Sequence, residues 1–378
     1  MLTAVLAVVA LPAVADSVVR AILALLARRW RFDVSQAARL DHVLVIVPAQ
    51  GEGAAVEPTV ASLAAAVRGH TVTVVVVLDG DDPEAAAVCA RLGVTTAVKS
   101  PAGPSKGAAL AWAVEYFADE ISSADAVLVV DVGSVVGPAF FEHFLWPEGA
   151  AAVQTFLAGQ GEGVGAAAVV SERAAQCWED RGRERLGWAV RLRGTGTAMR
   201  PDVFAAIAPL MRTRIEDIEA SVVLASRGQA IRMAPEQAQV ADVKPESAGD
   251  IARQRARWLI GRFALPFRQP AAIGRLLVRH PLEGAAFVLE LLGRPLSLSG
   301  ILRVAVAVLL LLPPEGAPAL WRVVIAGLAL ASVGLDIFLL RLSGGLTWRN
   351  AAGMVMAWVG AVAMAPRAAF GWAKVRRR

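Results

Sequence analysis

Between residues 41 and 260 the chain alternates short apolar runs with helical patterns of apolar and polar positions. Three of the apolar runs are rich in valine and end in a loop that contains glycine or acidic residues. With their loops, these runs occupy 42–53, 71–83 and 124–131. The helical patterns between them include 84–92 and 107–118. Runs that are apolar at consecutive positions are typical of strands buried on both faces, so the pattern predicts an α/β domain with a mainly parallel sheet covered by helices.

Acidic residues follow the predicted strands. Glu52 lies in the loop after the first run, Asp79 follows the second run, and Asp131 ends the third. In open parallel sheets, ligands bind beyond the carboxyl ends of the strands. We therefore expect these three carboxylates to meet at one edge of the sheet and to line a binding site there.

A strongly apolar segment, residues 1–31, precedes this domain. It lacks the basic start of a signal peptide, and it exceeds the roughly 20 residues that cross a bilayer. Asp16 and Arg20 lie four residues apart within it and therefore on one helix face. Charged groups in a membrane are costly unless they are paired. We predict a transmembrane helix in which these two side chains form an ion pair; the alternative is that both lie at the interface of a tilted helix.

Apolar character returns in the last third of the chain. Residues 250–294 mix arginines with large apolar side chains, which predicts amphipathic helices on a membrane surface. Two apolar arms, 296–312 and 319–340, predict a transmembrane hairpin in which Arg303 must pair or reach the interface. We expect the last segment, 350–373, to be re-entrant or interfacial, because a third crossing after a cytoplasmic domain would place the C-terminal arginines outside.

The composition is that of a membrane protein with one globular domain. Hydrophobic residues make up 56% of the chain and the mean hydropathy is +0.54, whereas soluble proteins contain roughly 45–50% apolar residues. Basic clusters at 28–31 and 374–378 flank the apolar segments, which is the cytoplasmic signature in a bacterial-type inner membrane. The predicted parts are a transmembrane helix, a cytoplasmic domain, interfacial helices and a C-terminal membrane region, at 1–31, 41–249, 250–294 and 296–378.

The charge and the cysteines exclude other classes. A net charge of +5 does not indicate nucleic-acid binding, because no basic stripe in the domain is interleaved with aromatic residues. Cys89 and Cys177 fit no paired spacing, which favours a reducing compartment without disulfides. Two to four apolar segments are too few for an ordinary transporter pathway.

Seven short motifs carry the candidate chemistry, and their order is more specific than any one of them. They are "VPAQGE" (47–52), "VLDGDDP" (77–83), "SKGAAL" (105–110), "DVGS" (131–134), "GTGTAMRPDVF" (194–204), "RIEDIEAS" (214–221) and "QRARW" (254–258). Alone, a Glu-Asp pair or a Gln-x-x-Arg-Trp string is more often a helix face. Together they supply carboxylates that can bind a nucleobase, a ribose or a metal. They also supply a carboxylate that can accept a proton and an arginine that can bind phosphate.

In this order the motifs resemble those of the membrane-bound inverting glycosyltransferases of family 2, the group that contains cellulose, hyaluronan and poly-N-acetylglucosamine synthases. The resemblance covers about residues 42–262 and implies a GT-A-type domain that binds a nucleotide sugar. It makes Asp217 the catalytic base and Asp131 a ligand of Mg²⁺ or Mn²⁺. The other donor- and acceptor-binding residues that it implies are Pro48, Glu52, Asp79, Lys106, Gly194, Thr195, Gly196, Glu216, Gln254, Arg257 and Trp258.

The resemblance also implies roles and partners. Asp79 is expected to contact the base, Gln254 and Arg257 the diphosphate, and Trp258 the entrance of the acceptor. The expected reaction moves a sugar from a UDP-sugar, with inversion, to a lipid or glycan acceptor at the cytoplasmic face. A homo-oligomer or partner subunits would supply the channel that a polymer product needs.

Three positions depart from the family pattern: Gly51 replaces Asn, Gly133 replaces the second metal-binding Asp, and Ile215 replaces Thr. Because Mg²⁺ keeps several waters and takes only one or two carboxylates, Asp131 alone could still hold it. Glycine could instead occupy position 133 because the backbone turns there at a positive φ. The departures keep a second hypothesis open, a catalytically silent subunit of a polysaccharide or glycolipid assembly or export complex.

Overall fold

The strands of the structure lie where the apolar runs predict them. The computed structural model describes residues 2–67, 69–161, 164–211, 215–244, 247–312 and 319–375. Within these ranges, the central sheet consists of β2 (Val43–Ala49), β3 (Val72–Asp79), β4 (Thr95–Lys99), β5 (Ala126–Val129), β8 (Ala152–Gln154), β10 (Thr197–Met199) and β11 (Ile231–Met233). Two smaller sheets contain β6 (Ser134–Val136), β9 (Phe156–Leu157) and β12 (Gln239–Asp242), and β1 (Ala37–Ala38) and β7 (Trp146–Pro147).

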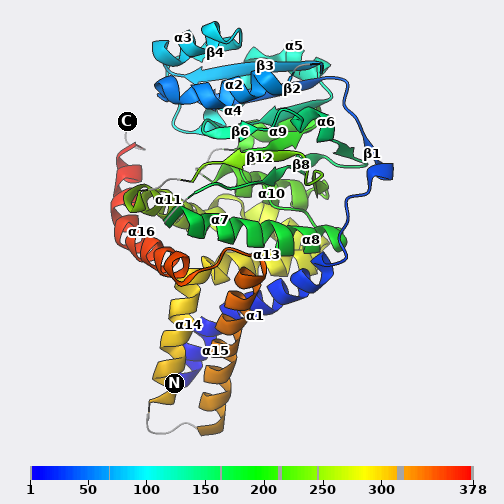
Figure 1. The fold of residues 1–378 in the computed structure, drawn as a ribbon. Coiled ribbons are helices and arrows are strands. Elements are labelled where there is room, and N and C mark those ends of the chain that lie inside the picture. The colour runs from blue at the N-terminus through cyan, green and yellow to red at the C-terminus, as the bar shows by residue number, and fades with distance from the viewer. Residues whose placement is uncertain are drawn as a thin grey trace.

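The central sheet is mainly parallel (Figure 1). Its strand order is β11-β8-β10-β5-β2-β3-β4. Strands β5, β2, β3 and β4 pair in parallel, as do β8 and β11, whereas β10 is antiparallel to both of its neighbours. This arrangement confirms the predicted GT-A-like α/β fold.

Helices connect the strands and continue beyond the sheet. The first half contains α1 (Leu2–Ala27), α2 (Glu57–Ala66), α3 (Pro83–Arg91), α4 (Lys106–Tyr116), α5 (Ala118–Ser123), α6 (Phe140–His143), α7 (Val164–Ala174) and α8 (Arg181–Arg185). The second half contains α9 (Pro201–Ile207), α10 (Glu216–Ser226), α11 (Ala248–Arg268), α12 (Pro270–Arg279), α13 (Pro281–Gly293), α14 (Leu296–Leu311), α15 (Ala319–Leu342) and α16 (Trp348–Val375). Short turns of helix are η1 (Val34–Gln36), η2 (Gly53–Val56), the π-helical η3 (Ala175–Asp180) and η4 (Ala208–Leu210).

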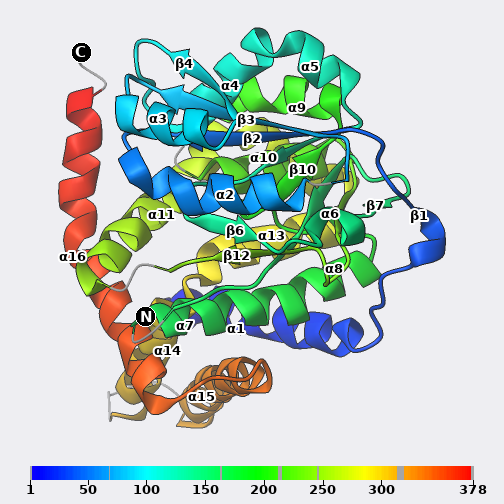
Figure 2. The same cartoon turned by 45° about the horizontal axis from the view of Figure 1, so that its top comes forward.

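The sheet is buried on both faces, as its continuous apolar strands predict. Leu44 and Ile46 of β2 pack with α4, α9 and α10, whereas Val45 and Val47 point to the other face and pack with α2, α3 and α6. Figure 2 shows these helices on opposite sides of the strands. The two layers leave the carboxyl ends of β2, β3 and β5 as the accessible edge of the sheet.

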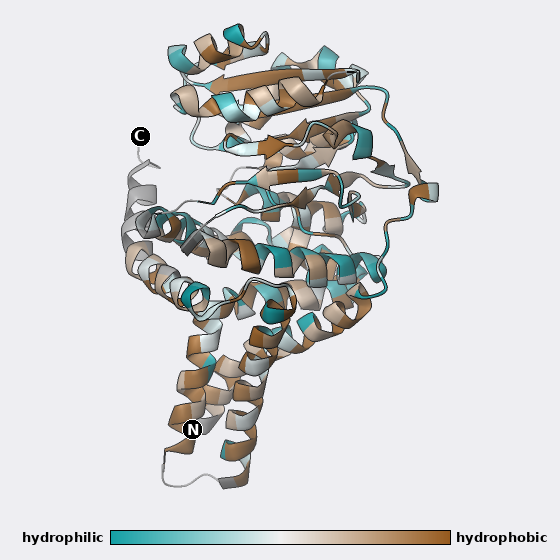
Figure 3. Ribbon diagram, viewed as in Figure 1, coloured by the Kyte–Doolittle hydropathy of each residue, from teal (hydrophilic) through white to brown (hydrophobic). Residues whose placement is uncertain are grey.

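Apolar helices lie at both ends of the chain. In the described part of the chain, two helices are long and apolar enough to span a bilayer, at Ala4–Ala27 in α1 and Leu320–Leu342 in α15. The predicted first arm of the hairpin is shorter: α14 continues α13 after a bend of 74°, and the bent pair is one further candidate. Figure 3 shows α14 and α15 as largely hydrophobic helices that project from the domain.

The charged side chains of α1 pair with distant partners. Arg20 contacts Glu179 of η3 at 2.9 Å and Asp336 of α15 at 2.5 Å, and Asp16 contacts Arg294 at 3.4 Å. The predicted ion pair between Asp16 and Arg20 is therefore wrong. Both side chains face other elements of the structure. Their partners, Glu179, Asp336 and Arg294, lie outside α1, so the spacing of residues within α1 could not reveal these contacts.

Arg303 also pairs inside the helical bundle. Its Nη2 donates to Asp336 Oδ2 at 2.6 Å, and its Nη1 donates to the hydroxyls of Ser17 and Ser332. Arg303 is 1% exposed and therefore does not reach the interface. The sequence left open whether Arg303 pairs or reaches the interface, and in the structure it pairs.

The last helix does not lie beside the hairpin along its length. α16 contacts α11 and α7 and rises beside the domain in Figure 1. Trp358 of α16 packs on Ala256 and Leu259 of α11. The predicted turn at 313–318, the side chains of Pro366, Arg367, Trp372 and Lys374, and the arginines at 376–378 lie outside the described residues.

Candidate active site

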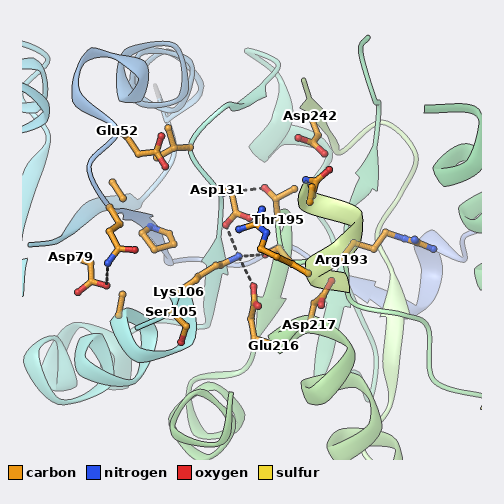
Figure 4. Close-up of a pocket in the computed structure, with 18 of the residues that line it drawn as sticks. Glu52, Asp79, Ser105, Lys106, Asp131, Arg193, Thr195, Glu216, Asp217 and Asp242 are labelled. Atoms are coloured by element: carbon orange, nitrogen blue, oxygen red, sulfur yellow. Dashed lines mark hydrogen bonds and ion pairs between the residues drawn. The ribbon is translucent and has the colours of Figure 1, made fainter. Parts of the chain in front are cut away.

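A cleft of about 570 Å³ opens beyond the carboxyl ends of β2, β3 and β5. Every predicted site residue except Gly196 lines it: Pro48, Glu52, Asp79, Lys106, Asp131, Gly194, Thr195, Glu216, Asp217, Gln254, Arg257 and Trp258. These residues come from both halves of the chain, and Figure 4 shows their side chains converging. The expectation that the three strand-end carboxylates meet at one edge is confirmed in this geometry.

Asp79 forms one end of the cleft, at the last position of β3. Its Oδ1 accepts hydrogen bonds from Lys99 Nζ at 2.8 Å and from the Gly103 backbone N–H at 2.7 Å. Its Oδ2 accepts from Gln50 Nε2 at 3.3 Å. The carboxylate is thereby fixed in orientation, and it lies beside the loop that leads to α4.

The centre of the cleft holds an ion pair between Lys106 and Asp131. Lys106 Nζ lies 2.5 Å from Asp131 Oδ1 and 3.7 Å from Glu216 Oε1, and it donates to the Gly194 carbonyl at 2.9 Å. Burial lowers the pKa of Lys106, but Asp131 and Glu216 raise that pKa by more, so it lies above its ordinary value. The cleft therefore contains a fixed ammonium ion.

Gly133 occupies the turn that leads from Asp131 into β6. Its φ is +88°, a conformation that residues with a side chain rarely adopt. Its N–H donates to the Thr59 hydroxyl at 3.0 Å. Of the two explanations for glycine at this position, the structure supports the backbone turn.

Thr195 of the Gly-Thr-Gly turn lies beside Asp131 (Figure 4). The Thr195 hydroxyl accepts from the Asp131 N–H at 3.1 Å and donates to Ser134 Oγ at 2.9 Å. A Cβ on Gly194 would lie 3.6 Å from Lys106 Nζ, 3.7 Å from Asp131 Oδ2 and 4.0 Å from Asp217 Oδ2, so Gly194 is surrounded by the charged groups of the site.

Gly196 faces the interior instead of the cleft. A Cβ there would lie 2.0 Å from Thr155 Oγ1, and the Gly196 carbonyl accepts a hydrogen bond from that hydroxyl at 2.9 Å. Gly196 therefore does not line the cleft, and its contact with substrate stays a prediction. Its backbone packs against β8 and the chain that follows, and it holds the turn in place.

Asp217 lies in the first turn of α10, next to Glu216. Its Oδ1 accepts from the Ile218 N–H at 2.8 Å, which is an ordinary contact for a carboxylate at a helix N-terminus. Burial and then Glu216 raise the pKa of Asp217, whereas the Ile218 N–H, Lys106 and Arg193 lower it, and the resulting pKa is about 7. A carboxylate with this pKa can accept a proton near neutral pH. Arg214, the first residue of this motif, lies outside the described residues.

α11 forms the wall opposite the sheet. Gln254, Arg257 and Trp258 lie at helix positions i, i+3 and i+4, and all three line the cleft. The indole of Trp258 is at the rim, since the residue is 40% exposed. The other face of α11 packs on α16 through Ala256 and Leu259. This division explains why one helix carries both the motif and an apolar surface.

Several residues of the cleft were missed from the sequence. They are Gln50, Ser105, Glu172, Arg193, Asp242, Val243 and Lys244. Arg193 directly precedes the Gly-Thr-Gly turn, and that adjacency could have identified it. Lys244 pairs with Glu172 at 2.8 Å and also with Asp242. These three come from β12, the chain that follows it and α7, and no sequence pattern indicated that they meet.

The residues of the cleft do not fit a resident divalent cation. Among the described residues, no group of three His, Cys, Asp or Glu side chains could hold a metal ion. Asp131 Oδ1 lies 2.5 Å from Lys106 Nζ, and Gly133 has no side-chain ligand to add. The prediction of Mg²⁺ or Mn²⁺ on Asp131 therefore lacks a coordinating set.

Comparisons with known proteins agree with this geometry. Residues 41–261 match the model of the family described as "Glycosyltransferase like family 2". The mannosyltransferase PcManGT from Pyrobaculum calidifontis, solved with GDP-Man and Mn²⁺, has 15% sequence identity and a TM-score of 0.57, over 94% of this chain and 99% of that chain. No curated protein sequence matches the chain.

A second solved structure is more distant. Glucosyl-3-phosphoglycerate synthase from Mycobacterium tuberculosis, solved with Mn²⁺, uridine diphosphate and glucosyl-3-phosphoglycerate, has 17% identity and a TM-score of 0.40. The match covers 63% of this chain and 82% of that chain. At 15% identity the likeness to PcManGT bears on the fold alone, whereas the family match covers more than half of the chain.

Proposed function

The chain belongs to the glycosyltransferase like family 2, and from this premise we propose that it transfers a sugar with inversion from a nucleotide sugar to a lipid or glycan acceptor at the cytoplasmic face of a membrane. The observation that carries the proposal is a single cleft in which Asp79, Lys106, Asp217 and Arg257 line one space. Family membership favours an enzyme over the catalytically silent subunit.

The donor is proposed to lie along the strand ends. Asp79 suits the base, because its carboxylate is held in a fixed orientation by Lys99 and the Gly103 N–H. Lys106, Arg193 and Arg257 supply positive charge for the diphosphate in the middle of the cleft. The resemblance to the synthases favours a UDP-sugar, whereas PcManGT was solved with GDP-Man, so both nucleotides belong in the test.

Asp217 is proposed as the general base. The acceptor hydroxyl oxygen forms a bond to the anomeric carbon while the bond from that carbon to the diphosphate oxygen breaks. The electron pair of the broken bond leaves with the nucleoside diphosphate, and the hydroxyl proton passes to Asp217. A pKa of about 7 leaves a substantial fraction of the carboxylate ionised at neutral pH, and the same pKa makes it a competent proton acceptor.

The acceptor is proposed to enter past Trp258. This side chain is at the rim of the cleft, on the helix that also contacts α16. Phe263 and Phe267, further along α11, are 65% and 87% exposed, and Arg268 lies beside them. Large apolar side chains next to arginines suit a membrane surface, which supports an interfacial position for the 250–294 region and a lipid acceptor.

We propose a bacterial-type inner membrane location with the cleft on the cytoplasmic side. α1 ends at Ala27 and three arginines follow within four residues, which is the expected cytoplasmic end of a span. The hairpin of α14 and α15 returns the chain to the domain side, where α16 lies along α11 and α7. An interfacial α16 removes the need for a further crossing and leaves the basic C-terminus on the cytoplasmic side.

The test is product formation in membranes that contain the full chain. Isotope-labelled UDP-sugars and GDP-sugars are supplied in turn, and lipid and glycan extracts are analysed by mass spectrometry. We expect labelled sugar in one extract, and none when Asp217→Asn is present at the same protein level. Absence of transfer and of donor hydrolysis with every donor would overturn the proposed function.

A further inference from the structure

Lys106 holds its ammonium group against Asp131, the carboxylate that is expected to bind a metal. Lys106 Nζ is 2.5 Å from Asp131 Oδ1, whereas Mg²⁺ binds carboxylate oxygens at about 2.0–2.1 Å. A divalent ion on Oδ1 would have to share that oxygen with the ammonium group. The ion pair therefore disfavours a metal there, because the two positive charges repel each other.

The ammonium group is held from several directions. The Gly194 carbonyl accepts from Nζ at 2.9 Å, and Glu216 lies 3.7 Å away on the opposite side from Asp131 in Figure 4. Lys106 is also the first residue of α4, whose N-terminus is capped by the Ser105 side chain. The start of a helix carries partial positive charge, which adds to that of the ammonium.

Two other carboxylates of the cleft are already paired. Asp79 accepts from Lys99, and Asp242 contacts Lys244. A second carboxylate next to Asp131 is disfavoured, because Gly133 turns at a φ of +88°. Within the described ranges no group of three acidic, histidine or cysteine side chains is placed to hold a metal.

Positive charge from the protein is available for the donor. Arg193 and Lys244 line the same cleft as Lys106 and Arg257. Arg193 Nε is buried and has no hydrogen-bond partner among the described residues, although its Nη2 donates to Asp180. An unsatisfied buried donor at the wall of a cleft is suited to an anionic ligand such as a phosphate.

We propose that Lys106 takes the place of the divalent cation, so that this chain binds its donor diphosphate and transfers sugar without a divalent metal. This rests on the proposed function and names the group that neutralises the leaving diphosphate. As the bond from the anomeric carbon to the diphosphate oxygen breaks, the electron pair stays with the nucleoside diphosphate. The Lys106 ammonium donates a hydrogen bond to it and keeps its proton, while the acceptor proton goes to Asp217.

Calorimetry on the full chain in detergent tests the proposal, with UDP and GDP as ligands and with either a chelator or Mn²⁺ present. We expect the Kd of the nucleotide that binds to differ by less than about threefold between the two conditions. Lys106→Met is expected to weaken binding about ten- to a hundredfold. Lys106→Arg keeps a cation and should retain most of the affinity. Arg91→Gln, a surface variant that loses its contact to Glu57, is the matched control and should bind as the unmodified chain does.

Lys106→Met gives a second, more specific readout. With the ammonium removed, Asp131 Oδ1 is free, so Mn²⁺ should now improve nucleotide binding in this variant although it has no effect in the unmodified chain. Thermal unfolding of both forms checks that the variant is folded.

Opposite results separate the two proposals. If a chelator weakens nucleotide binding by about tenfold or more in the unmodified chain and Mn²⁺ restores it, the metal-free site is wrong, while transfer of labelled sugar would leave the proposed function standing. Equal nucleotide binding by Lys106→Met and the unmodified chain would also overturn the metal-free site. Loss of transfer and of nucleotide binding in every condition would overturn both.

Discussion

Replacing Asp217 by asparagine retains the size of the side chain and removes its charge and its ability to accept a proton. If Asp217 is the general base, Asp217→Asn should lower kcat by about 10²- to 10⁴-fold, the range that a positioned base contributes. In the unmodified chain, transfer should fall as the pH drops through about 7, because only the ionised carboxylate accepts the proton.

Asp217→Asn should also change the free energy of unfolding. Burial, and then Glu216, raise the pKa of Asp217 from 3.8 to about 7 in the folded chain. Ionising this group therefore costs the folded state free energy. The free energy of unfolding is not affected below about pH 4, and it falls as the pH rises from there through about 7. At about 1.4 kcal/mol for each tenfold change in acidity, the full cost is about 4 kcal/mol. Water in the open cleft screens the charge, so we expect about 2 kcal/mol.

Thermal unfolding of the detergent-solubilised chain between pH 4 and pH 9 measures this cost. Asp217→Asn should be more stable than the unmodified chain above pH 7 and equal to it near pH 4. Asp202→Asn removes an exposed carboxylate outside the cleft and serves as the matched control, with no pH-dependent difference. A variant that keeps full transfer, or a stability difference that is the same at all pH values, would refute the reasoning.

Substitutions at three further positions probe the turn at Gly133, the buried ion pairs of the helical bundle and the rim of the cleft. Gly133→Ala and Gly133→Asp should each lower the free energy of unfolding by about 1 kcal/mol, because both place a side chain at a φ of +88°, and Mn²⁺ titration should show no higher affinity in the aspartate form. Asp336→Asn leaves Arg20 and Arg303 buried with a weaker partner and should cost about 3–5 kcal/mol in thermal unfolding. Trp258→Ala should raise the acceptor KM about tenfold and leave nucleotide binding unchanged in calorimetry.

Each of these expectations has an outcome that contradicts it. Tighter Mn²⁺ binding by Gly133→Asp than by Gly133→Ala would show that a missing ligand, not the backbone, explains the glycine. An Asp336→Asn variant as stable as Asp202→Asn would remove the energetic role of the buried ion pairs. Weaker nucleotide binding by Trp258→Ala would place the indole at the donor and not at the acceptor.

Local pattern was sufficient for the sheet and for most of the cleft. Consecutive apolar residues in β2 and β3 indicate strands covered on both faces, and the edge where parallel strands end is fixed by the fold class, so Asp79 and Asp131 could be predicted to lie at one edge. The helical period put Gln254, Arg257 and Trp258 on one helix face, and the resemblance to the family assigned them to the site. The order of the motifs then supplied the family.

Contacts across the chain could not be predicted in the same way. The pairing of Lys106 with Asp131 depends on where α4 begins relative to β5, and no spacing in the sequence encodes that distance. Gly196 lies two residues from Gly194 but packs against Thr155, and both glycines turn at a positive φ, so neither the strand nor the helix period describes the directions that they face. Lys244 reaches the cleft from the end of a small second sheet that the sequence did not reveal.

In the sequence the apolar helices and the catalytic domain are separate segments, but in the structure buried charged side chains connect them. Glu179 and Asp180 are consecutive residues of the π-helical turn η3. Glu179 contacts Arg20 of α1 and Arg294, whereas Asp180 contacts Arg193, which lines the cleft. π-helical turns are frequent at functional sites, and this one joins the buried ion pairs of the helical bundle to a cation of the cleft. Because buried charges tolerate little displacement once their partners are fixed, we expect the position of Arg193 to depend on how α1 packs against η3.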